Sequence, residues 1–149
     1  MVYKAQGLDR VEQQLRVAAG ETRAFTQDEV SITGHAIEVR INAEDPAGGA
    51  FLPSPGRIHT LRVPDGYGVR FDSGYEAGDE ISQVSVNRVV ELEVWVGNRD
   101  TAIRRTMRAL GEMEVGGVAT TIPADVAILE HPDFGAVAHS TKWVEETLD

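Results

Sequence analysis

The amino-acid sequence predicts an α+β fold in which a mainly antiparallel sheet is flanked by helices. Apolar residues recur at helical spacing near the N-terminus, alternate with polar residues through the middle of the chain, and return to helical spacing after residue 100. A period that changes from 3.6 to 2 and back indicates a helix, then strands, then helices. A run of strands followed by a run of helices is typical of α+β proteins.

Composition limits the classes of protein to consider. The chain has 149 residues, of which 42% are hydrophobic, so we expect a single domain over residues 1–149. It has no cysteine, which excludes a disulfide framework. A formal net charge of −10 argues against nucleic acid or an anionic membrane as a partner. No apolar run approaches the ~20 residues of a bilayer span and no signal peptide is evident, so we expect a cytoplasmic protein.

The first predicted element is a helix between Gly7 and Gly20. Leu8, Val11 and Leu15 share one face of it, and Gly20 is suited to end it with a left-handed backbone. A helix this short needs a surface to pack on.

Strands are predicted next, wherever apolar and polar residues alternate: residues 30–32, 37–41, 58–63, 69–71 and 84–96. The last is the most regular, and only Arg88 interrupts its apolar face. The prolines and glycines of residues 46–56 and 64–66 mark loops between the strands.

Three helices are predicted after the strands. Asp100 is the expected N-cap of the first, which ends before Gly116. Pro123 suits the first turn of the second. Ser140 is expected to cap the last helix, which turns Trp143 inward.

The first polar grouping lies on one predicted strand, where Glu38, Arg40, Asn42 and Glu44 alternate and therefore share a face. A solvated face held by salt bridges is the ordinary interpretation, and the polar wall of a cleft is the alternative.

Tyr67, Arg70 and Asp72 form a second polar grouping. Arg70 and Asp72 share a strand face, which suits a simple ion pair or a clamp for an anion or carbonyl, because guanidinium matches planar oxygen acceptors. The four histidines lack metal-ligand spacing, and no phosphate-binding or nucleophile motif is found. We therefore expect no metal and no cofactor.

Several stretches of the chain resemble the sequence motifs of a known domain. Residues 34–46 read GHAIEVRINAEDP, residues 51–58 read FLPSPGRI and residues 68–70 read GVR, with shorter matches in the same order up to residue 143. Together they resemble the C-terminal domain of biotin carboxylase, the ATP-dependent component of acyl-CoA, acetyl-CoA and pyruvate carboxylases. The resemblance implies a barrel-sandwich-like sheet flanked by helices.

The resemblance also implies roles for particular residues. The arginine of the family's G-V-R motif contacts biotin and bicarbonate, and here it is Arg70. A region near Arg99 would form part of a dimer surface. In the family an ATP-grasp domain, which we do not find in this sequence, holds ATP, magnesium and the catalytic base. We therefore expect no ATP-dependent carboxylation by this chain alone.

Residues 84–92 depart from the family pattern. The family's Y-Y-D-S/N-L-x-x-K-L gives way to VSVNRVVEL, with an extra residue before Gly97 and Glu91 in place of lysine. The apolar alternation is nevertheless kept, although a one-residue slip turns every side chain over. This predicts a retained strand with new surface chemistry, in which Val84 and Val86 make the rim of a cleft more apolar.

Three hypotheses of function follow. The main one is a repurposed domain that binds or transforms a small organic molecule by cofactor-free cyclisation or isomerisation, with Arg70 as a carbonyl clamp and Glu91 or Glu38 as acid or base. Its expected ligand-binding residues are Arg40, Tyr67, Asp72, Val84, Val86 and Trp95.

The second hypothesis is a fragment or split part of a biotin carboxylase subunit that needs an ATP-grasp partner. The third is a non-catalytic regulator that pairs with a carboxylase. Apolar surface left exposed by such a domain also leads us to expect a homodimer.

Overall fold

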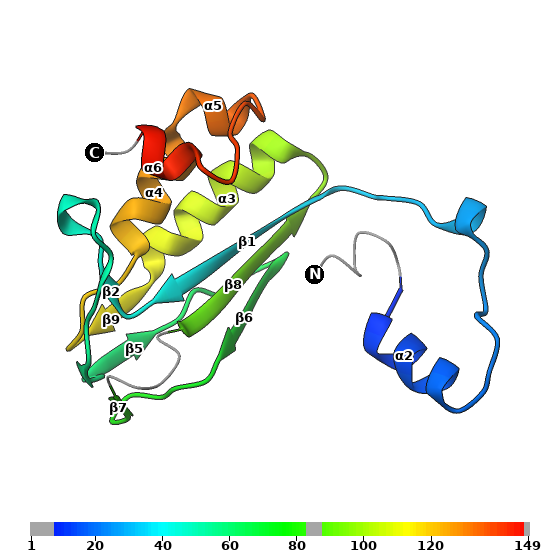
Figure 1. The fold of residues 1–149 in the computed structure, drawn as a ribbon, viewed down its shortest axis with the longest axis horizontal. Coiled ribbons are helices and arrows are strands. Elements are labelled where there is room, and N and C mark those ends of the chain that lie inside the picture. The colour runs from blue at the N-terminus through cyan, green and yellow to red at the C-terminus, as the bar shows by residue number, and fades with distance from the viewer. Residues whose placement is uncertain (1–7, 83–87, 148–149) are drawn as a thin grey trace.

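The computed structural model describes residues 8–82 and 88–147 and confirms the α+β class (Figure 1). Its largest sheet is antiparallel with the strand order β1-β8-β6, formed by β1 (His35–Asn42), β6 (Val69–Ser73) and β8 (Arg88–Val96).

Six short strands form three further antiparallel pairs. They are β2 (Glu44–Asp45) with β3 (Leu52–Pro53), β4 (Gly56–Arg57) with β7 (Glu80–Ile81), and β5 (Thr60–Arg62) with β9 (Glu114–Gly116). Within residues 8–82 and 88–147 the strands close no barrel, so the barrel-sandwich detail of the predicted fold is not confirmed.

Helices cover one face of the three-stranded sheet (Figure 1). They are α3 (Arg99–Glu112), α4 (Ile122–Glu130), α5 (Pro132–Gly135) and α6 (Trp143–Thr147). The alternate apolar residues of the strands point toward α3 and form the core: Ile37, Val39, Ile41, Val90, Leu92, Val94 and Val96, packed with Ala102, Ala109 and Leu110. The opposite face of the sheet carries mainly polar side chains, and Ala36 and Trp95 lie opposite each other on it.

An irregularity in β8 explains why Arg88 interrupts the apolar pattern. Val89 and Val90 are adjacent yet both are buried, and the pairing of β1 with β8 shifts register between Ile41 and Asn42. This is a β-bulge, in which one strand carries an extra residue. Because of the bulge, Arg88 points to the polar side of the sheet. The predicted strand residues Val84 and Val86 lie outside the described residues.

The structure corrects several predicted boundaries. Residues 30–32 form no strand; the short 3-10 helix η1 (Gln27–Glu29) precedes them and Ile32 is exposed. Asn98, not Asp100, caps α3, because its extended backbone lets its Oδ1 accept the N–H of Thr101 at 2.9 Å. β9, α5 and the 3-10 turn η2 (Ala47–Gly49) were not predicted.

Helix α2 (Arg10–Ala18) stands apart from the sheet and is joined to β1 by an extended segment (Figure 1). The predicted helix is confirmed: Asp9 caps it by accepting the N–H of Val11 and of Glu12, each at 3.0 Å, and Gly20 follows it with φ +89°. The expected packing surface is not supplied by the described residues, because none of the residues of α2 is buried. No helix in the described ranges is long and apolar enough to cross a bilayer.

Candidate functional site

The face of the sheet opposite α3 carries a compact group of charges, which we call the polar sheet face. It consists of Glu38, Arg40, Arg70, Asp72, Arg88, Glu91 and Glu93. Antiparallel pairing aligns these residues in rows across the strands: Glu38 lies opposite Glu93 and Glu93 opposite Arg70. In the next row Arg40 lies opposite Glu91, and Glu91 opposite Asp72. Strand alternation alone therefore brings predicted residues from both polar groupings together.

Each carboxylate that the register places opposite another carboxylate is paired with an arginine. Arg40 donates from Nε to Glu38 at 2.8 Å and lies 3.8 Å from Glu91. The hydrogen bond to Glu38, more than the charges of Glu38 and Glu91, raises the pKa of Arg40 above its ordinary value. Like charges opposite one another destabilise a sheet, so these arginines offset a repulsion built into the register.

Arg70 occupies the β6 side of the polar sheet face. Its Nη2 lies 2.7 Å from Asp72 and its Nη1 lies 3.9 Å from Glu93. The Arg70 side chain is 39% exposed whereas Glu93 is 13% exposed, so the carboxylate is the more deeply placed of the two. A guanidinium held by two carboxylates has a fixed plane, and it still presents several N–H donors.

The local backbone fixes the position from which the Arg70 side chain extends. Gly68 has φ +75°, and a Cβ at this position would lie 2.2 Å from the carbonyl oxygen of Trp95. The carbonyl of Gly68 in turn accepts the N–H of Trp95 at 2.8 Å. Only glycine permits this approach, which seats β6 against β8 two residues before Arg70.

The bulge in β8 brings an arginine to this face that sequence reasoning did not select. Arg88 forms an ion pair with Glu91. A hollow of about 360 Å³ lies beside the pair, lined also by Asp72, Ser73 and Val89. The extra residue in this strand was the sequence feature that could have indicated a bulge. Without a bulge, regular alternation places the Arg88 side chain in the core.

A second hollow, of about 270 Å³, lies between the outer edge of β1 and α4. Glu38 and Arg40 line it, together with the carboxyl group of Asp125. Burial raises the pKa of Asp125 to about 6, against the opposing effect of the Thr121 hydroxyl, which donates to its Oδ2 at 3.1 Å. Asp125 was not selected from the sequence, because only the packing of α4 against β1 places it here.

Two of the predicted ligand residues, Trp95 and Tyr67, have partners within the protein. The indole N–H of Trp95 donates to the carbonyl of Thr33 at 2.9 Å and fastens the extended segment before β1. Tyr67 is not brought to the polar sheet face. Its ring lies 5.7 Å from the guanidinium of Arg105 on α3, and its carbonyl accepts from that residue at 2.8 Å. The direction of a side chain in a turn does not follow strand alternation, and a role of Tyr67 in ligand binding stays a prediction. Val84 and Val86 cannot be placed, since they lie outside the described residues.

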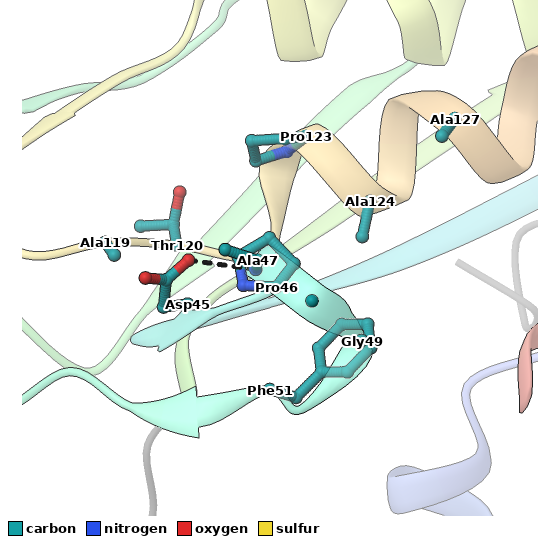
Figure 2. Close-up of a pocket in the computed structure, with 11 residues that line it drawn as sticks. Asp45, Pro46, Ala47, Gly49, Phe51, Ala119, Thr120, Pro123, Ala124 and Ala127 are labelled. Carbon is teal, nitrogen blue, oxygen red and sulfur yellow. Dashed lines mark hydrogen bonds between the residues drawn. The ribbon is translucent and has the colours of Figure 1, made fainter. Parts of the chain in front are cut away.

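A further cavity lies elsewhere, between the η2 turn and the start of α4 (Figure 2). It measures about 580 Å³ and is lined mainly by small apolar residues and the ring of Phe51. Its one charged lining residue, Asp45, accepts the N–H of Ala47 at 3.0 Å (Figure 2). A single carboxylate already engaged with the backbone offers little chemistry, so the polar sheet face remains the candidate site.

The arrangement suits recognition of a planar polar group rather than independent catalysis. Three arginines and four carboxylates leave the polar sheet face with a formal excess of one negative charge. Such a face does not attract an anion through its net field, although an arginine on it can donate paired hydrogen bonds. No group of three or more His, Asp or Glu side chains suited to a metal ion occurs in the part of the chain that the structure describes.

Known proteins match this chain over almost its whole length. The family model of the biotin carboxylase C-terminal domain matches residues 38–146. The biotin carboxylase of a Nostoc species is 44% identical over 140 residues, which is 94% of this chain and 31% of that protein. The biotin-dependent acyl-coenzyme A carboxylase alpha3 subunit of Mycobacterium leprae is 42% identical, over 93% of this chain and 24% of that protein.

Solved structures give the same result. The biotin carboxylase domain dimer of Hydrogenobacter thermophilus 2-oxoglutarate carboxylase, in complex with MgADP, ADP and bicarbonate, matches with a TM-score of 0.90 and 38% identity. The match covers 97% of this chain and 32% of that one, so the chain spans about a third of the length of this relative. The chain belongs to the biotin carboxylase C-terminal domain family.

Proposed function

We propose that this chain is the C-terminal part of a biotin carboxylase and that its polar sheet face helps to bind the substrates of biotin carboxylation. The observation that carries the proposal is the position of Arg70. This residue is the arginine of the family's G-V-R motif, and it is oriented by Asp72 and Glu93. Bicarbonate and the ureido group of biotin are both planar and rich in oxygen, which suits a guanidinium held in one plane.

The excess negative charge of the polar sheet face favours the second of the three hypotheses. A face with more carboxylates than arginines needs cations from elsewhere to hold bicarbonate, so the site is completed by the rest of a biotin carboxylase. The relatives, which are several times longer than this chain, support the same assignment. The comparisons give no support to a repurposed cyclase or isomerase, and none to a separate regulator.

The test is reconstitution of this chain with the remaining part of a biotin carboxylase, measured as bicarbonate-dependent ATP hydrolysis in the presence of biotin. Arg70→Ala is expected to lower kcat/KM for bicarbonate by roughly 10²–10³-fold, the usual effect of removing one charged hydrogen-bond donor. Arg70→Lys should restore only part of the activity, because lysine cannot donate two parallel hydrogen bonds.

Arg62→Ala is the matched control. Arg62 is 72% exposed and lies 3.6 Å from Glu114, away from the polar sheet face. It should leave the rate unchanged. Full activity in the Arg70→Ala protein would show that the polar sheet face is not the substrate site.

A further inference from the structure

The hollow of about 270 Å³ between β1 and α4 combines an apolar wall with charged groups. Ile128 and Leu129 of α4 and Phe134 of α5 form the apolar wall. Four consecutive residues of β1, at positions 37–40, line the opposite side. Successive side chains of a strand point to opposite faces of its sheet, so a hollow that touches all four residues lies along the edge of the strand.

Asp125 supplies this hollow with a carboxylate that has no counter-ion in the described part of the chain. Its Oδ2 accepts a hydrogen bond from the Thr121 hydroxyl at 3.1 Å, and its Oδ1 has no hydrogen-bond partner in residues 8–82 and 88–147. Burial raises the pKa of Asp125 to about 6, and no charged side chain of the described residues opposes the effect. At pH 8 the group is nevertheless ionised. A buried carboxylate is unfavourable unless it is paired, so a cation that enters the hollow is stabilised there.

The other charged groups of the hollow are already paired with each other. Arg40 donates from Nε to Glu38 at 2.8 Å and lies 3.8 Å from Glu91, so its guanidinium is held toward the polar sheet face. Asp125, Glu38 and Arg40 together carry one negative charge in excess when all are ionised. This charge disfavours an anion in the hollow and leaves room for one more positive charge.

The edge of β1 adds a backbone acceptor to the two carboxylates. The Thr121 hydroxyl accepts the N–H of Asn42 at 3.1 Å, which shows that Asn42 directs its backbone groups away from β8. Alternate residues of an antiparallel strand share this direction, so the C=O of Glu38 also points to the open edge. It has no partner among the described residues. An ammonium group carries three N–H donors, and the hollow offers three acceptors: the C=O and the carboxylate of Glu38, and Oδ1 of Asp125.

We propose that this hollow binds a primary alkylammonium group, with its charge against Asp125 and its alkyl chain against Ile128, Leu129 and Phe134. A neutral alcohol of the same length fits the apolar wall but leaves the charge of Asp125 unpaired. A free alkylamine and the side chain of a lysine share this chemistry. The inference does not depend on the proposed function, because the alkylammonium group takes no part in carboxylation.

The experiment titrates the 149-residue chain with n-pentylamine at pH 8 and follows its amide chemical shifts by NMR. Amides of β1 and α4 should shift, with a Kd on the order of 1 mM, as is usual for so small a ligand. The neutral analogue 1-pentanol should bind at least roughly tenfold more weakly, because it offers no charge to Asp125. N-acetyl-lysine-N-methylamide is the second probe: the tighter of the two amines identifies the source of the ammonium group.

Asp125→Asn should raise the Kd of n-pentylamine at least roughly tenfold, because it removes the charge and keeps the shape of the side chain. Glu130→Gln is the matched control, since Glu130 also lies on α4, is exposed and does not line the hollow. It should alter the Kd less than about twofold. Near-ultraviolet circular dichroism of both variants should equal that of the wild type, so that a loss of binding reports on the hollow.

Three results would overturn the inference. They are no shift of β1 and α4 amides with either amine, binding of 1-pentanol as tight as that of n-pentylamine, and an unchanged Kd in the Asp125→Asn protein. An equal loss in the Glu130→Gln protein would also contradict it, because the amine would then respond to the net charge of the chain. Binding of either amine that only Asp125→Asn weakens supports the inference.

Discussion

Asp125 carries a carboxyl group whose pKa, at about 6, lies above the ordinary value of 3.8. Below about pH 4 the carboxyl is mostly protonated in both the folded and the unfolded chain, so its burial does not lower the free energy of unfolding. Between pH 4 and pH 6 the unfolded chain loses this proton first, and the folded state is destabilised as pH rises. Above pH 6 the cost is fully present, on the order of 3 kcal/mol.

Asp125→Asn should remove this cost while keeping an oxygen for the Thr121 hydroxyl. We expect the variant to unfold at higher urea than the wild type at pH 8, with the difference disappearing toward pH 4. Urea titrations across this range measure it. A variant less stable than the wild type at pH 8 would mean that the charged carboxylate contributes to stability.

Gly68 shows how one backbone position controls a charged side chain. In Gly68→Ala the new Cβ meets the carbonyl of Trp95, and alanine also resists the positive φ. We expect a loss of roughly 2–4 kcal/mol in the free energy of unfolding, measured by urea denaturation. Gly74→Ala is the control, because nothing lies within 4 Å of its Cβ position. Equal stability of the two variants would contradict the close approach of β6 and β8.

At the scale of elements, α2 and α3 have similar caps and different surroundings. Asp9 caps α2, which has no buried residue, whereas Asn98 caps α3, which packs on the sheet with Ala102, Ala109 and Leu110. A lost cap costs about 1 kcal/mol of helix stability in either case. Only a helix that unfolds together with the core transmits this cost to the whole protein.

Asn98→Ala should therefore lower the global free energy of unfolding by about 1 kcal/mol. Asp9→Ala should leave it unchanged and instead speed amide exchange in α2. Hydrogen exchange and urea denaturation of both variants separate the two effects. An equal global loss in the Asp9→Ala protein would show that α2 unfolds together with the sheet.

For the whole molecule, local periodicity was enough to predict the class of fold and most of the polar sheet face. Period-two alternation depends only on neighbouring residues, so it placed Glu38 and Arg40 on one face of β1 and Arg70 and Asp72 on one face of β6. The helix boundaries were predicted less well, because Asn98 and Asp100 are both chemically suited to cap α3 and only the backbone conformation decides between them.

The features that sequence reasoning missed depend on contacts between distant parts of the chain. Asp125 lies beside Glu38 and Arg40 because α4 packs against β1, and Arg88 lies on the polar sheet face because a bulge holds Val89 in the core. Tyr67 contacts Arg105 of α3, which donates to its carbonyl at 2.8 Å. None of these contacts leaves a periodic signal in the sequence.

The bond between the Trp95 indole and the Thr33 carbonyl supplies an intrinsic optical probe. The molecule has two tryptophans, and the other, Trp143, is buried against His131 and donates to Asp133 at 3.0 Å. Indole emission shifts when its N–H partner changes. Movement of the segment that carries α2 therefore alters the fluorescence of Trp95 while Trp143 provides an internal reference, so assembly can be followed in real time without a dye.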